Sequence, residues 1–206
     1  PSILQWNLAR FAEALLPVLN SEDREAAIQL ATEEVDAFGP IFLSEWEGVM
    51  GAKLGLAERR EGDGKLAGDL LDLMADAEVD FTRAFRALSD VLRGYRAGVQ
   101  ALFPDSGDVD AWLDRWTGRV DAESDGESTA YRAARATRMD RVNPIYIPRN
   151  HLVEEALEAA ETSLDLEPAR QLLDLLSDPF TARPGFDRFA DPAPGDFGPY
   201  VTFCGT

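Results

Sequence analysis

The sequence predicts an all-α protein, and three features of the 206 residues indicate it. Apolar residues recur at helical spacing through most of the first 177 residues. No stretch of useful length alternates apolar and polar residues as a half-buried strand would. Prolines and glycines mostly fall where these periodic segments end, or gather after residue 178. We expect at most one short extended piece, near 200–203.

The first third of the chain is expected to contain three helices. Apolar spacing from Leu4 to Leu16 predicts a helix that ends near Pro17. Asn20 or Ser21 can cap a second helix, which should break or kink at Gly39-Pro40. A third helix is expected over 41–50, followed by a charged, glycine-containing and flexible loop over 55–65.

The remainder should continue as helices up to residue 177. Helical patterns cover 66–77, 79–92, 109–120 and 127–139, with a turn at 104–107. An Asn-Pro-Tyr connector over 141–151 contains two prolines and should separate a helix end from a helix start. Two more helices follow, the last capped by Asp165 with Pro168 in its first turn. We therefore expect a helical domain over 1–177 and an irregular strap, rich in proline, glycine and aromatic residues, over 178–206.

The composition excludes several classes of function. The chain carries 38 acidic and 20 basic residues, a net charge of −18. Nucleic acids and anionic membrane surfaces both require a basic face, so neither is expected as a partner. The sequence has no apolar run of membrane-spanning length, and its single cysteine cannot form an internal disulfide. We expect a cytoplasmic protein, and the absence of an initiating Met fits a fragment.

Several segments in order resemble the signature of the selenoprotein O family. The most specific is Arg141-Val142-Asn143-Pro144-Ile145-Tyr146-Ile147-Pro148-Arg149-Asn150-His151. The others are Gln5-Trp6-Asn7-Leu8-Ala9-Arg10-Phe11-Ala12, Asp80-Phe81-Thr82-Arg83-Ala84-Phe85-Arg86-Ala87-Leu88, Trp112 to Arg119, Pro194-Gly195-Asp196-Phe197-Gly198 and Cys204-Gly205-Thr206. Phe197 replaces a family tryptophan, and Gly205-Thr206 replaces two serines.

The resemblance implies a fold and a parent activity. It implies the multi-helix C-terminal region of a protein-kinase-like fold. Members of that family are understood to transfer AMP from ATP to protein hydroxyls, with Mg²⁺ or Mn²⁺. Their nucleotide- and metal-binding residues lie upstream of the matching segments, so we expect no catalytic, cofactor-binding or metal-binding residue in this chain. The expected partners are the upstream kinase-like part and the protein substrates of the parent.

The same resemblance supplies the candidate site residues. Cys204 stands where the family has a terminal cysteine or selenocysteine, so we expect a redox-active thiol whose partner lies outside this chain. An accessible terminal thiol is compatible with that chemistry, although it can equally be inert. The candidates for structural docking are Asn143, Tyr146, Arg149 and Asn150.

Other chemical motifs have structural interpretations that we favour. Asp196-Phe197-Gly198 matches the kinase metal-binding triplet, but no His-Arg-Asp element precedes it. His151 lacks ligand partners and is expected to cap or pack. The carboxylates of Glu154, Glu158 and Glu161 form a solvated face. The tryptophans are expected in the core. A basic ridge is expected either to pair with the chain's own acids or to dock against the kinase-like part; it comprises Arg132, Arg135, Arg138 and Arg141.

Two functions remain open from the sequence. The first is a helical part that supports a protein adenylyltransferase and is not catalytic alone. The alternative is a stand-alone acidic helical module for protein interaction.

Overall fold

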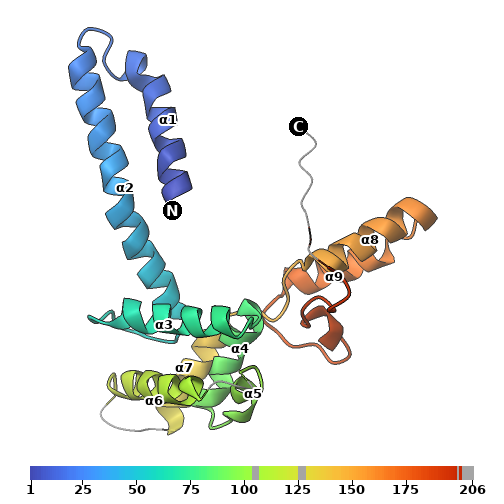
Figure 1. Ribbon diagram of the computed structural model, residues 1–206. Coiled ribbons are helices and arrows are strands. Elements are labelled where there is room, and N and C mark those ends of the chain that lie inside the picture. The colour runs from blue at the N-terminus through green and yellow to red at the C-terminus, as the bar shows by residue number, and fades with distance from the viewer. Residues whose placement is uncertain (104–106, 125–128, 199, 201–206) are drawn as a thin grey trace. The chain divides into compact units, whose positions relative to one another are not determined.

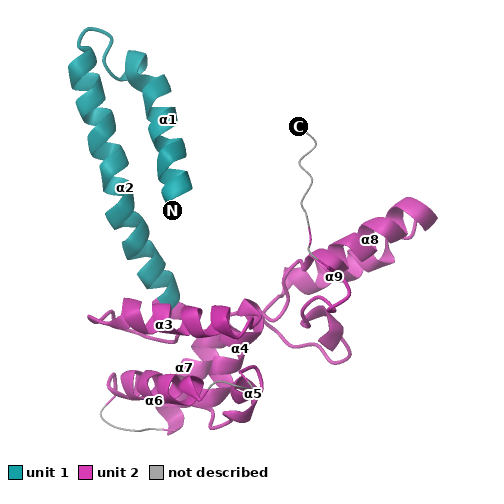
Figure 2. Cartoon of the chain, in the orientation of Figure 1, with its two compact units in different colours: residues 1–50 teal, residues 51–206 magenta. Residues whose placement is uncertain are grey.

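The computed structural model describes residues 1–103, 107–124, 129–198 and 200 (Figure 1). Helices and loops account for these residues, and no strand occurs among them. The prediction of an all-helical chain is confirmed to that extent. The chain divides into two compact units, residues 1–50 and 51–206 (Figure 2).

The first unit is a helical hairpin formed by α1 (Ser2–Leu19) and most of α2 (Arg24–Lys53). The Asn20 side chain accepts the backbone N–H of Asp23 at 2.9 Å, and the Asp23 carboxylate accepts that of Ala26 at 3.0 Å. Asp23 therefore caps α2, two to three residues later than the predicted caps, Asn20 or Ser21.

The sequence predicted a break or a kink at Gly39-Pro40, and the break is wrong, because the 30-residue helix α2 continues through both residues. A proline inside a helix removes one hydrogen bond and crowds one carbonyl, but the remaining hydrogen bonds of so long a helix are kept. Pro17 likewise lies inside α1, two residues before that helix ends.

In the second unit, α3 (Asp63–Asp76) packs on α6 (Asp108–Asp121). The Trp112 indole N–H donates to the Leu66 carbonyl, and that of Trp116 donates to the Leu54 carbonyl, each at 2.9 Å. Both indoles are fully buried and stacked with ring centroids 5.6 Å apart. Trp112 and Trp116 are thus core residues, as predicted, and both polar atoms are satisfied. The same prediction is wrong for Trp6, which is 61% exposed.

A second layer consists of α4 (Phe81–Leu92) against α7 (Thr129–Asp140), with a short α5 (Ala97–Gln100) that the sequence did not predict. Phe85 and Leu88 of α4 are buried in this layer. Gly55 approaches it with φ +71°, and a Cβ there would lie 2.7 Å from the sulfur of Met139. Only glycine fits that position without strain.

The last helices, α8 (Asn150–Ser163) and α9 (Glu167–Ser177), lie side by side (Figure 1). Pro168 lies in the first turn of α9, as predicted. The segment that follows is irregular and contains one short 3-10 helix, η1 (Asp187–Phe189). A small apolar cluster joins it to the two helices; its buried members are Tyr146, Leu152, Leu172, Leu175 and Phe189.

Candidate functional site

The connector between α7 and α8 begins with a buried asparagine. Asn143 is 1% exposed, and its side-chain amide donates to the Lys53 carbonyl at 2.8 Å. Its side-chain oxygen accepts from the Lys53 ammonium at 3.3 Å, while Arg86 donates to its backbone carbonyl at 3.1 Å. One side chain therefore closes the end of α2 onto the connector, 90 residues away in sequence.

Lys53 lies in an unusual environment. Its ammonium nitrogen is 5.4 Å and 5.3 Å from the ring centroids of Phe81 and Phe85. Partial burial lowers the pKa of the Lys53 ammonium. The two rings and Asn143 offset part of that desolvation through cation–π and hydrogen-bond contacts.

Tyr146 joins the connector to the segment after α9. Its backbone N–H donates to the Pro179 carbonyl at 3.2 Å, and its hydroxyl accepts the backbone N–H of Arg183 at 2.9 Å. The ring is 3% exposed and packs in the apolar cluster around Leu175. This tyrosine therefore anchors an irregular segment that has little regular hydrogen bonding of its own.

Arg149 makes the strongest polar contact of the connector. Its guanidinium donates two hydrogen bonds to the Asp80 carboxylate, at 2.8 and 3.0 Å, and one to the Ala190 carbonyl at 2.8 Å. The Arg149 side chain is 7% exposed, and its Nε is buried without a partner in the described structure. The fork geometry suits arginine and not lysine.

Asp80 has a second role, because its carboxylate also caps α4 through the backbone N–H of Arg83 at 2.9 Å. Burial by itself would raise the pKa of Asp80, but the hydrogen bonds from Arg149 and Arg83 and their charges outweigh it, so the pKa is lowered. The carboxylate is thus held ionised between two elements.

The remaining docking candidates lie at the start of α8. Asn150 is exposed, and its side chain makes no hydrogen bond to the described residues. His151 packs edge-on against Phe197, with ring centroids 5.8 Å apart, which agrees with its predicted packing role. Burial, followed by the charges of Arg149 and Arg188, lowers the pKa of His151. Cys204, the redox candidate, lies outside the described residues.

A second polar cluster was missed by the sequence analysis. The Glu123 carboxylate accepts the backbone N–H groups of Ala57 and Glu58 at 3.0–3.1 Å, and pairs with Arg119 at 2.9 Å and Arg135 at 3.0 Å. Arg119 also pairs with Asp63 at 2.7 Å. The i,i+4 spacing of Arg119 and Glu123 was a signal that could have revealed one of these contacts.

This cluster holds the predicted flexible loop against α6 and α7. Burial would raise the pKa of Glu123, but the backbone hydrogen bonds and Arg119 lower it overall. The pKa of Asp63 is lowered in the same way, with Arg119 and the Arg60 backbone N–H opposing burial.

The basic ridge divides into paired and exposed members. Arg132 pairs with Asp121, and Arg135 pairs with Glu123. Arg138 and Arg141 are exposed. Pairing within the chain thus explains two of the four arginines.

The partly buried carboxylates of the second unit are engaged in ion pairs. The partly buried carboxylates of Asp63, Asp80, Glu123 and Asp140 each contact at least one arginine. Among the described residues, no group of three or more His, Cys, Asp or Glu side chains could hold a metal ion. A cavity of about 290 Å³ beside the connector contains Arg83 and Arg86 together with Asp90, so its charge is mixed.

Within the described part of the chain, no helix is long and apolar enough to cross a lipid bilayer.

Comparison with known proteins identifies the family. The family model described as "Protein adenylyltransferase SelO" matches residues 1–177. Similar curated proteins, each named protein nucleotidyltransferase YdiU, include those of a Mycobacterium species (48% identical), Pseudarthrobacter chlorophenolicus (44%) and Sphingopyxis alaskensis (44%). Each match covers all of this chain but only 40–41% of the relative.

One prediction is corrected by this comparison. The matched stretch is assigned to the N-terminal part of these relatives, about the first 40% of their length, and not to their C-terminal part. The prediction that this chain is the C-terminal region of a protein-kinase-like fold is thereby contradicted. What the described residues do show is an all-helical part of a protein of this family. Motif order alone established which family is matched, and it did not establish position within the full-length protein. With the match covering 177 of 206 residues, the chain belongs to the SelO family.

Proposed function

We propose that this chain is a helical supporting part of a protein adenylyltransferase, and that it is not catalytic alone. In the full-length protein, a hydroxyl of a protein substrate would attack the α-phosphate of ATP, and pyrophosphate would leave. The nucleotide and a Mg²⁺ or Mn²⁺ ion would be bound by a kinase-like part of the same polypeptide. The family membership supports the reaction class, since the relatives are named nucleotidyltransferases.

The observation that supports this role is that buried ion pairs join loops and helix ends that lie far apart in the sequence. Arg149 joins the start of α8 to the start of α4, 69 residues apart in sequence. Glu123, just after α6, accepts from Ala57 in the loop after α2, 66 residues away, and pairs with Arg135 in the middle of α7. Such contacts hold chain segments in fixed positions, which is what a scaffold for a nucleotide-binding part requires.

The residues described in this chain do not fit ATP with a divalent ion. A metal bound to nucleotide phosphates needs carboxylates that are free to coordinate it. Here the partly buried carboxylates already contact arginines, and Asp196 of the Asp-Phe-Gly triplet is exposed in an irregular turn. We therefore derive no catalytic step from this chain.

The test measures transfer directly. The full-length protein and the 206-residue chain would each be incubated with ATP, Mg²⁺ or Mn²⁺ and a mixture of acceptor proteins, and intact masses recorded. We expect AMP-sized additions with the full-length protein and none with the chain alone. EDTA and an ATP analogue with a methylene bridge between the α- and β-phosphates, the bond broken in the proposed transfer, serve as controls.

Two other outcomes of this transfer assay would contradict different parts of the proposal. Transfer by the chain alone would show that its role is catalytic. No transfer by either protein, under both reducing and oxidising conditions, would contradict the proposed activity. The two redox conditions also address Cys204, because a Cys204→Ser variant of the full-length protein should lose any difference between them.

A further inference from the structure

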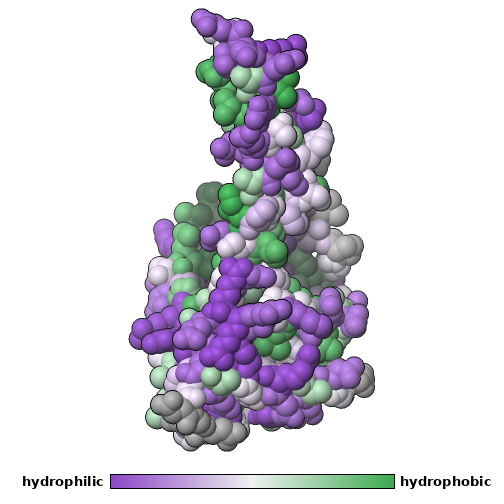
Figure 3. All heavy atoms as spheres, turned by 90° about the vertical axis from the view of Figure 1, so that its left-hand side faces the viewer, coloured by the Kyte–Doolittle hydropathy of each residue, from purple (hydrophilic) through white to green (hydrophobic). Residues whose placement is uncertain are grey.

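The α1–α2 hairpin exposes more apolar surface than a free-standing hairpin should. No residue of α1 is buried, although thirteen of its eighteen residues are apolar. Large side chains stand exposed around it, including Ile3 (77%), Trp6 (61%), Phe11 (62%) and Val18 (82%). A helix that is apolar on most sides is normally enclosed by other elements. Figure 3 shows green, hydrophobic patches among the purple, hydrophilic side chains of the hairpin.

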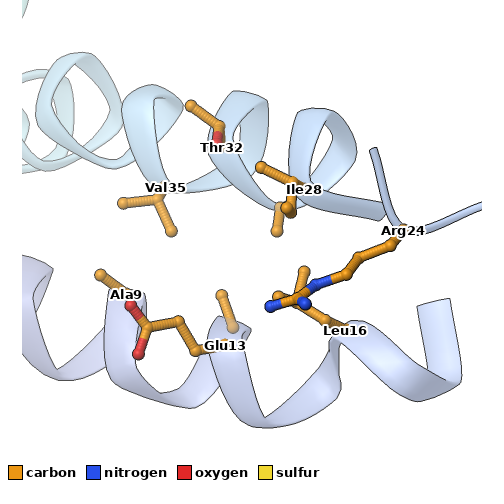
Figure 4. A pocket seen from close by; sticks show the side chains of 9 residues that line it. Ala9, Glu13, Leu16, Arg24, Ile28, Thr32 and Val35 are labelled. Carbon is orange, nitrogen blue, oxygen red and sulfur yellow. The ribbon is translucent and has the colours of Figure 1, made fainter. Parts of the chain in front are cut away.

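A groove runs between the two helices within this unit. Its volume is about 490 Å³. The groove is lined by three small side chains (Ala9, Ala12 and Ala31), three larger apolar ones (Leu16, Ile28 and Val35) and three polar ones (Glu13, Arg24 and Thr32). Figure 4 shows Ile28 and Val35 of α2 pointing across the groove towards α1. Small residues in such a groove let the side-chain ridge of another helix enter, as in ordinary helix packing.

The charge of the hairpin argues against a second copy as the occupant. Residues 1–50 contain nine acidic residues and two arginines, a net charge of −7. Arg10 already pairs with Glu13 at 2.6 Å. Two such hairpins would repel each other, whereas a helix carrying basic residues beside its apolar stripe would be attracted.

The length of the family's proteins supplies an occupant. About 60% of each relative lies outside the region matched by this chain. An isolated two-helix layer cannot build a core, and a domain needs at least one more layer against it. A segment of the same polypeptide is present at high effective concentration and needs no separate encounter.

We propose that the α1–α2 groove and the apolar surface of α1 are the docking surface for an amphipathic helix in the part of the full-length protein that this chain does not contain. That helix places apolar residues in the groove and basic residues against the net negative charge of the hairpin. The inference rests on the proposed supporting function and specifies how the helical part is attached.

Hydrogen exchange of the full-length protein, measured by mass spectrometry without ATP, tests the docking. We expect α1 amides to be protected at a level comparable to α6, whose tryptophans are buried. Ala31→Lys, which places a charge in the groove, should speed exchange in α1 at least tenfold and leave α6 unchanged. Gln29→Lys makes the same charge change at an exposed α2 position outside the groove, and should alter α1 exchange less than twofold.

A second measurement does not depend on a variant that folds. A photo-activated cross-linker at position 11, in place of the exposed Phe11, should attach to the part of the polypeptide beyond these 206 residues. Attachment only to residues 51–206, or only to a second molecule, would overturn the proposal, as would unprotected α1 amides. Since neither measurement uses catalysis, loss of AMP transfer with protected α1 would refute only the proposed activity.

Discussion

The Arg149–Asp80 pair offers the sharpest test of the supporting role. Replacing Arg149 with Met keeps most of the side-chain volume and removes the guanidinium. The Asp80 carboxylate, 21% exposed, would then lose two charge-assisted hydrogen bonds, and the Ala190 carbonyl would lose one. Removing one partner of a buried ion pair costs about 3–5 kcal/mol.

We expect the lower end of that range, about 3 kcal/mol, for a specific reason. Asp80 keeps the backbone N–H of Arg83 as a donor and has some access to water. The Arg149→Lys variant keeps the charge but cannot form the fork, and should cost about 1–2 kcal/mol. A cost of 3 kcal/mol corresponds to a change of roughly 100- to 200-fold in a local opening equilibrium.

Native-state hydrogen exchange in the full-length protein measures the local opening equilibrium at both ends of the pair. Protection in the first turns of α4 and α8 should fall about 100-fold in Arg149→Met. Arg83→Met is the matched control, because Arg83 is 43% exposed and its ion pair with the exposed Asp191 is long, at 3.8 Å. That surface pair is expected to contribute less than about 1 kcal/mol.

A double-mutant cycle separates the pair from other effects. Asp80→Asn retains the helix cap, so its coupling to Arg149→Met reports the ion pair. A coupling energy near 2 kcal/mol is expected. Protection that changes less than threefold in Arg149→Met, or a coupling near zero, would refute the argument that this contact holds the connector in place.

Three further predictions concern other contacts. Tyr146→Phe leaves the partly buried backbone N–H of Arg183 without its acceptor, and should cost about 1 kcal/mol, measured as faster exchange of the segment after α9. Gly55→Ala should destabilise by at least about 1 kcal/mol in urea unfolding, because of its positive φ and the close methionine sulfur, whereas Gly68→Ala, inside α3 with open space around it, should stabilise by about 0.5–1 kcal/mol. Because the pKa of Glu123 is lowered in the folded state, the unfolded chain binds more protons in acid. The free energy of unfolding should therefore be highest above about pH 4 and should fall as the pH drops through the folded-state pKa. Glu123→Gln should flatten this dependence, measured as urea unfolding midpoints between about pH 3 and 6.

The sequence was sufficient for most helices because their signals are local. Apolar spacing predicted α6, and Pro168 marked the first turn of α9. The continuity of α2 through Pro40 was not predictable in this way. A proline raises the cost of a helix by a fixed amount, and whether the neighbouring turns offset it depends on packing that a local pattern does not contain.

The candidate site was predictable in part, for a related reason. The connector sequence identified Asn143, Tyr146 and Arg149 as residues of interest, and the structure places all three in buried polar contacts. Their partners could not be derived, because Asp80 and Lys53 lie 69 and 90 residues away and carry no pattern that pairs them. The docking of these residues against another part of the protein stays a prediction.

The resemblance itself gains a physical interpretation from these contacts. The matching segments contribute Asp80 and Arg86, Trp112 and Arg119, and Arg149, and each of these side chains makes a hydrogen bond to a residue more than 40 positions distant. Such contacts fix the positions of helices that are distant in sequence. We therefore expect a substitution at any of them to lower the stability of the fold. The contacts made by these segments support the proposed scaffold role of this chain, and activity has to be tested on the full-length protein.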